Sequence, residues 1–281
     1  MKTATIVTLC ITVFGLLGCS HSKSNDTASW LRDNDIESLQ TYFDDLQRRF
    51  TDGAATEFEL RDNYRPFYQL DDLAVRHLRD WAESSAESYP AHLAFGIYLK
   101  KRAIAARGGD YIAKTPRARL DEAQKYFVQS AVELQKSLPL TAKPYLSLFH
   151  LLDIEMYVGD RVTAETSLRA AQELFPANML VRDRYQQSLM PRWGGSYQEA
   201  EAFILKTKEA GGSQNLISQL QAIEYDDKGH ALEESGDHAG AHAAFEHALS
   251  LGKTVGGTFS KDFLDVSRYY ICSNNRSTYC E

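Results

Sequence analysis

The chain has 281 residues, 43% of them hydrophobic and 25% charged, which is enough for one elongated domain or two compact ones. Its 31 lysines and arginines face 38 aspartates and glutamates, so the formal net charge is −7. An acidic chain repels nucleic acid and anionic lipid headgroups, which argues against nucleic-acid binding and against a polybasic membrane anchor. The sequence contains no His-Glu-x-x-His, Gly-x-x-x-x-Gly-Lys or Gly-x-Ser-x-Gly pattern, so it indicates neither an enzyme nor a cofactor.

The first residues have the order of a secretory signal, with Lys2, an uncharged run from Ala4 to Leu17 and then the small Gly18. The run is too short to span a bilayer comfortably. Leu16-Leu17-Gly18-Cys19 resembles the lipobox of bacterial lipoproteins, which implies cleavage after residue 18 and lipidation, including palmitate, of Cys19. The alternative is an ordinary secretory signal in which the cysteine occurs by chance.

Residues 20–29 are almost entirely small and polar, so we expect a flexible tether over 19–29 and folded structure from Trp30. Ser20, rather than an aspartate, follows the cysteine. In similar Gram-negative lipoproteins this choice implies an outer-membrane anchor facing the periplasm, with the inner membrane or surface display as alternatives.

Two cysteines, Cys272 and Cys280, are left once Cys10 leaves with the signal and Cys19 carries lipid. Outside the cytoplasm they are most simply a disulfide that closes the loop 272–280. A metal site is the alternative, but two thiols without a nearby histidine supply only half of its ligands.

Beyond Trp30 the hydrophobic residues follow helical spacing. Leu39, Phe43, Leu46 and Phe50 form one apolar stripe, and no alternating run indicates a strand. The sequence therefore predicts an all-α domain over residues 30–281.

A template of a small, a large apolar and a second small residue recurs four times at helical spacing. Its copies are Ala123, Phe127 and Ser130; Ala164, Leu168 and Ala171; Ala200, Ile204 and Thr207; and Ala241, Phe245 and Ala248. Gly159, Gly195 and Gly236 each precede a copy by five residues, where a turn would end the preceding helix. We expect helical hairpins whose small residues admit close packing.

The copy at 222–255 resembles a tetratricopeptide repeat, and the copy at 145–178 does so more weakly. The string Pro191-Arg192-Trp193-Gly194-Gly195-Ser196 and the segment 103–109 are similar to a bacterial tetratricopeptide-like family of unassigned function. The resemblance implies a right-handed α-solenoid, continuous or split near Pro191 into blocks 30–190 and 191–281. By analogy with tetratricopeptide repeats, the first helix of each hairpin would line the groove of the solenoid. These lining positions lie around Tyr98 and Lys101, in 148–155 and in 226–233.

Three groups of residues are candidate sites. Arg192 and Trp193, at a helix break, could contact a partner, although a structural plug is the preferred interpretation. A basic cluster could dock an acidic partner or be a solvated face; it comprises Lys100, Lys101, Arg102 and Arg107. His238 and His242, with Glu246 one turn further, have metal-ligand spacing but are better read as solvated, because the apolar template claims the packing face of that helix.

We therefore expect a non-enzymatic protein-interaction module, a scaffold or adaptor for protein partners in the bacterial envelope, held to the membrane by its lipid. An immunity lipoprotein that neutralises a toxic effector is one alternative. A cell-wall or glycan-acting enzyme or binder that uses the aromatic residues is another. The sequence does not indicate an oligomeric state.

Overall fold

The computed structural model describes residues 24–109, 112–255 and 267. Its α-helices are α1 (Ser24–Arg32), α2 (Ile36–Thr51), α3 (Glu57–Asn63), α4 (Asp72–Ser84), α5 (Tyr89–Arg107), α6 (Arg117–Ser137), α7 (Tyr145–Val158), α8 (Arg161–Leu174), α9 (Leu180–Ser188), α10 (Tyr197–Glu209), α11 (Gln214–Ser235) and α12 (His238–Val255). The 3₁₀ turns are η1 (Arg65–Tyr68), η2 (Ile112–Lys114), η3 (Leu138–Leu140) and η4 (Pro191–Trp193). Every regular element of the described residues is helical, which confirms the all-α prediction.

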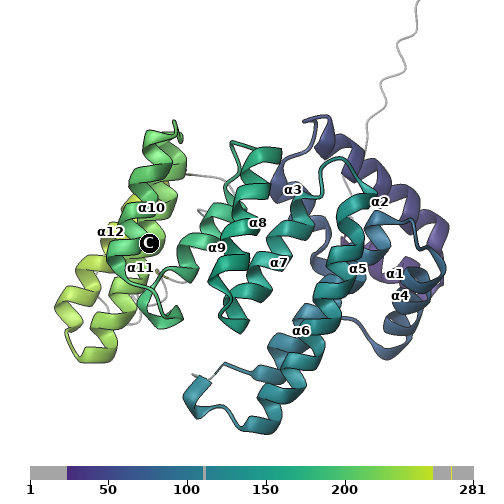
Figure 1. The fold of residues 1–281 in the computed structure, drawn as a ribbon, viewed down its shortest axis with the longest axis horizontal. Coiled ribbons are helices and arrows are strands. Elements are labelled where there is room, and N and C mark those ends of the chain that lie inside the picture. The colour runs from purple at the N-terminus through teal and green to yellow at the C-terminus, as the bar shows by residue number, and fades with distance from the viewer. Residues whose placement is uncertain (1–23, 110–111, 256–266, 268–281) are drawn as a thin grey trace, which may run out of the picture.

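The helices follow one another along the long axis of the molecule (Figure 1). The purple and blue helices α1, α2 and α4 lie at one end, α5 to α9 lie in the middle, and the green α10 to α12 lie at the other end. Among the described residues, no helix has the length and apolar character that a membrane crossing requires. The predicted lipidation of Cys19 and the predicted disulfide of Cys272 and Cys280 concern residues outside the described ranges.

The first helix begins earlier than predicted. Helix α1 starts at Ser24, inside the segment expected to be a tether up to residue 29. Thr27 and Leu31 are buried, and α1 packs on α4. Arg32 Nε also donates to Asp71 Oδ2 at 2.6 Å. The polar composition of this segment was misleading because two buried positions, four residues apart, are enough to dock so short a helix.

The repeated template lies on the buried faces of the second helices. All of its small and large residues in α6, α8, α10 and α12 are buried. Helix α5 pairs with α6, α7 with α8 and α11 with α12, as the hairpin prediction requires, whereas α10, which carries the third copy, packs on α11 and does not form a hairpin with α9. The packing is close: a Cβ added to Gly229 of α11 would lie 2.6 Å from the ring of Phe245, and one on Gly96 of α5 would lie 2.8 Å from Leu134.

Two of the three predicted turn glycines end helices. Gly159 closes α7 and Gly236 closes α11, both in the left-handed conformation that glycine adopts without steric cost. Gly195 does not. The left-handed residue there is Gly194, with φ of +84°, which follows the 3₁₀ turn η4 and not an α-helix.

A buried carboxylate joins α3 to the start of α9. Glu57 accepts hydrogen bonds from the backbone N–H groups of Met179, at 2.7 Å, and Leu180, at 3.0 Å, and also from the hydroxyl of Tyr145. Met179 occupies the N-cap of α9 without a side-chain cap of its own. Glu57 therefore caps this helix from more than one hundred residues away, where a carboxylate also favours the positive helix end.

Candidate functional site

The turn η4 carries the Pro-Arg-Trp-Gly-Gly string and connects α9 to α10. Pro191 fits the first positions of a 3₁₀ turn, where a missing N–H costs nothing. Gly195 lies so close to α9 that an added Cβ would be 2.0 Å from the carbonyl oxygen of Leu189. Only a residue without a side chain fits there, so the string specifies this turn sterically.

The two predicted contact residues of the turn are held by neighbouring helices. Arg192 Nε pairs with Asp227 Oδ1 of α11 at 2.5 Å, and the Tyr197 hydroxyl donates to Oδ2 of the same carboxylate at 3.1 Å. The half-buried ring of Trp193 packs edge-to-face on Tyr157 of α7, with the centroids 5.4 Å apart. These contacts agree with the structural interpretation. Partner binding by either residue stays a prediction.

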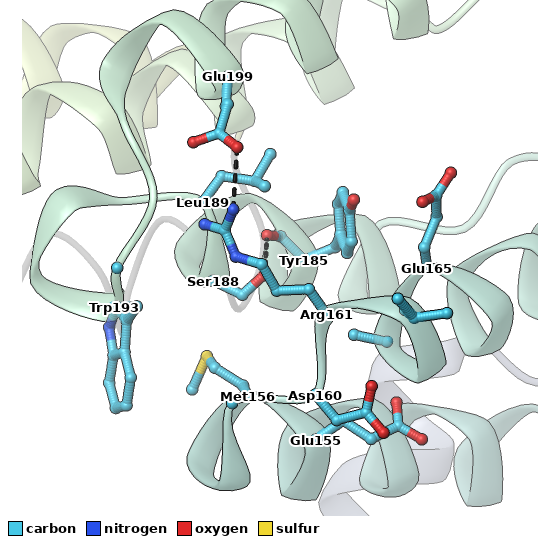
Figure 2. Close-up of a pocket in the computed structure, with 14 residues that line it drawn as sticks. Glu155, Met156, Asp160, Arg161, Glu165, Tyr185, Ser188, Leu189, Trp193 and Glu199 are labelled. Carbon is cyan, nitrogen blue, oxygen red and sulfur yellow. Dashed lines mark hydrogen bonds and ion pairs between the residues drawn. The ribbon is translucent and has the colours of Figure 1, made fainter.

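A cleft of about 490 Å³ lies beside this turn, between the α7–α8 hairpin, α9 and the start of α10. In Figure 2, Trp193 stands on one side of the cleft, Glu165 on the other, and Met156, Glu155 and Asp160 lie below. Arg161 at the start of α8 donates from Nη1 to Glu199 Oε1 of α10 at 2.9 Å, so an ion pair joins the two walls. The lining thus combines aromatic and apolar surface with charged groups.

Glu155 is the most unusual group of the cleft. Its side chain comes from the buried helix α7 and is only 8% exposed. Ser167 Oγ donates to Oε1 at 3.2 Å, whereas Oε2 is buried with no hydrogen-bond partner in the described part of the chain. Burial, with a smaller contribution from the Asp160 charge, raises the pKa of Glu155 to about 7.

The basic cluster is not one solvated face. Lys100 is fully buried, and the prediction that places it on an exposed patch is wrong. Its ammonium lies 2.8 Å from His150 Nδ1 and pairs with Asp153, both on α7. Burial lowers the pKa of Lys100 to about 8 against the attraction of Asp153. The lysine turns inward because its position on α5 faces α7, and the long side chain reaches acceptors there.

The remaining members of the cluster lie over aromatic rings. The ammonium of Lys101 is 4.1 Å from the centroid of the Tyr68 ring, while Arg102 and Arg107 lie 5.7 Å and 5.8 Å from the rings of Tyr126 and Tyr157. Arg102 is exposed and the other two are half-buried. Each of these three basic side chains therefore has a cation–π contact within the protein. That the cluster docks an acidic partner stays a prediction.

Buried polar groups connect the first helices of successive hairpins. Asp153 of α7 pairs through Oδ1 with Arg184 Nε of α9 at 3.3 Å. Asp183 of α9 accepts from Gln219 Nε2 of α11 at 3.3 Å. Burial opposes the charge on Asp153, but Arg184 and Lys100 outweigh it and hold the pKa below its ordinary value. Helices α5, α7, α9 and α11 are thus linked in sequence by polar contacts.

Each histidine of the candidate metal pair lies beside one glutamate. His238 Nδ1 lies 3.0 Å from Glu233, and His242 Nδ1 lies 3.9 Å from Glu246. No cluster of three histidine, cysteine, aspartate or glutamate side chains within the described ranges could hold a metal ion.

The residues that form the cleft were largely missed from the sequence. The range 148–155 was expected to line a groove, and it contains Glu155. Arg161, Tyr185 and Glu199 carried no local signal, because they meet only when α8, α9 and α10 pack together. Trp193 at the helix break, and the carboxylates Asp153 and Glu155 within the otherwise largely apolar helix Tyr145–Val158, were the available signs of a special site.

Comparison with known proteins finds no match to this chain among protein-family models, curated proteins or solved structures.

Proposed function

We propose that this chain is a non-enzymatic protein-interaction module, an α-solenoid of tetratricopeptide-like hairpins that binds a segment of a protein partner. The cleft between α7–α8 and η4–α10 carries the proposal. It offers Trp193, Tyr185 and Met156 together with Arg161, and aromatic residues, methionine and arginine are enriched where proteins contact one another. Its volume of about 490 Å³ suits a few side chains of an inserted segment.

The arrangement of the hairpins supports the same proposal. Helix α7 contacts both α5 and α9, and α9 contacts α11, while α6, α8 and α12 pair with α5, α7 and α11. Repetition of this kind produces the extended surfaces by which helical-repeat proteins recognise their partners. The polar contacts between successive first helices stiffen that surface.

The N-terminal sequence supports a location for this activity. With Cys19 lipidated, the module would be anchored to an envelope membrane, most simply the outer membrane facing the periplasm. Its partner would then be an envelope protein that carries an accessible segment.

Site-specific photocrosslinking tests the proposal. Val162 lines the cleft and is 78% exposed, so p-benzoylphenylalanine at this position would reach a bound segment without disturbing the core. Val128 on α6 is 53% exposed, lies outside this cleft and serves as the matched control. We expect a discrete protein adduct from position 162 in intact cells and none from position 128. No adduct at position 162, or the same adducts at both, would overturn the proposal, and the identity of the adduct separates a scaffold from an immunity role.

A further inference from the structure

The charge of the cleft is strongly one-sided. Four carboxyl side chains line it, and they come from α7, from α8 with its N-cap, and from α10; they are Glu155, Asp160, Glu165 and Glu199. Arg161 is the lone cation among the lining residues, and Glu199 already pairs with it. Asp160 is engaged as the cap of α8, where it accepts from the backbone N–H and the hydroxyl of Thr163. The carboxyl charge of the cleft exceeds what Arg161 neutralises.

Glu155 is the buried carboxylate of the cleft that lacks a hydrogen-bond partner at one oxygen among the residues that the structure describes. More than nine-tenths of its side chain is buried, and Oε2 accepts no hydrogen bond from any described residue. A buried acceptor without a donor costs free energy that a donor from a ligand would recover. The gain is larger if the donor is positively charged, because a charge-assisted bond in a poorly solvated site is stronger than a neutral one.

Aromatic side chains complete the site. Trp193 and Tyr185 stand on two sides of the space above Glu155 (Figure 2). Indole and phenol rings attract cations through their faces, and they pack well on the aliphatic stems of long basic side chains. Carboxylates and aromatic rings around one cleft are what an arginine or a lysine requires.

We propose that the cleft receives a basic side chain, arginine or lysine, of the partner segment, with the carboxylate of Glu155 as its ion-pair partner. This inference rests on the proposed function, since it names the chemistry of the segment that the module binds. The basic group supplies the hydrogen-bond donor that Glu155 lacks, while its stem packs between Trp193 and Tyr185.

Amino-acid amides provide the test. Nα-acetyl-arginine amide and Nα-acetyl-lysine amide are titrated into the purified full-length chain, with Nα-acetyl-citrulline amide as the uncharged isostere of arginine. The indole N–H resonance of Trp193, assigned with Trp193→Phe, reports occupancy of the cleft. We expect the citrulline amide to bind about tenfold more weakly than the arginine amide. Equal binding of the two, or no binding of either basic amide, overturns the inference.

Glu155→Gln keeps the shape of the side chain and removes its charge. The variant should lose the preference for arginine over citrulline, whereas Glu173→Gln, on the exposed face of the same α8 that walls the cleft, should keep it. Retention of the preference in Glu155→Gln would assign the cation to another carboxylate and contradict the inference.

The pH dependence gives an independent measurement. Because the pKa of Glu155 is about 7, its ionised fraction rises from about a tenth at pH 6 to about nine-tenths at pH 8. Binding of the arginine amide should tighten several-fold over this range in the parent chain and stay flat in Glu155→Gln. The other groups that line the cleft around Glu155 are Asp160, Arg161, Glu165, Tyr185 and Glu199. A similar dependence in both proteins would show that one of them is responsible.

This outcome is separable from that of the crosslinking experiment. An adduct at position 162 with no preference for the basic amides would support the interaction module and contradict the inference that the cleft receives a basic side chain. Binding of the basic amides without any protein adduct would contradict the interaction module and indicate a site for small cations.

Discussion

At the scale of single residues, two buried glutamates show opposite environments. Glu57 accepts hydrogen bonds from two backbone N–H groups and a hydroxyl, which offset part of the burial that raises its pKa. Glu155 accepts from Ser167 alone, and its second oxygen is left without a partner in the described structure. Burial without compensation destabilises the folded protein, which makes Glu155 costly to retain for structural reasons alone.

The stability of the protein should therefore improve when Glu155 is replaced by glutamine. The pKa of Glu155 rises from an ordinary 4.5 to about 7 on folding, so folding takes up a proton between these values. The stabilisation that this proton uptake gives the folded protein is complete below pH 4.5 and is lost as the pH rises through 7. At pH 8 Glu155→Gln should be more stable than the parent by on the order of 1–3 kcal/mol. At pH 4.5 the two should be nearly equal.

Urea denaturation at both pH values measures this difference, with Glu173→Gln as the exposed control. If the parent and Glu155→Gln lose stability in parallel between pH 5 and 8, the carboxyl is not the group that takes up the proton.

At the scale of elements, the turn η4 is fixed by contacts to three helices. Gly195 packs on the end of α9, Trp193 on α7, and Arg192 pairs with Asp227 of α11. The cleft takes one wall from this turn, so its shape depends on how closely the turn approaches α9.

Gly195→Ala should disturb that approach. The new methyl group would lie 2.0 Å from the Leu189 carbonyl oxygen, which forces the backbone to move. We expect a loss of about 2–3 kcal/mol in the free energy of unfolding and a weaker ion pair between Arg161 and Glu199. Gly109→Ala is the matched control, since nothing lies within 4 Å of a Cβ at that position. Equal stability of the two variants, measured by thermal unfolding, would show that the turn accommodates the added methyl group without a loss of stability.

Elements and their contacts differed in how far the sequence predicted them. The small–large–small template found the packing faces of α6, α8, α10 and α12, because it depends on spacing within one helix. Lys100 was misplaced because its partners, His150 and Asp153, are about fifty residues away. Most of the cleft was missed for the same reason: its lining residues come together only after α7, α8, α9 and α10 pack around the turn η4.

At the scale of the whole molecule, polar contacts between residues far apart in the sequence connect the row of helices. The carboxylate of Glu57 ties α3, in the N-terminal part, to the start of α9. The polar contacts of Asp153 with Lys100 and Arg184 also link α5 to α7 and α7 to α9. Hairpins that would otherwise contact only their neighbours are thereby coupled across the molecule.

Glu57→Ala should therefore destabilise distant segments together. It leaves two backbone N–H groups and the Tyr145 hydroxyl without their acceptor in a buried site, which costs about 3–5 kcal/mol. Hydrogen exchange should accelerate at Met179 and Leu180 as well as in α3. Glu59→Ala, which removes a half-exposed partner of Arg49, should cost less than about 1 kcal/mol. Faster exchange confined to α3 would show that α9 does not depend on this cap.

The early start of α1 limits how far the protein could extend from a membrane. Five peptide units separate Cys19 from Ser24, and a fully extended chain covers at most about 3.6 Å per residue, which is about 18 Å in all. In the proposed lipidated form, the start of α1 would stay within this distance of the bilayer, and the folded body would remain next to the membrane. Partners that share this membrane would meet it by lateral diffusion at a high effective concentration, so even a weak interaction through the cleft could be well occupied.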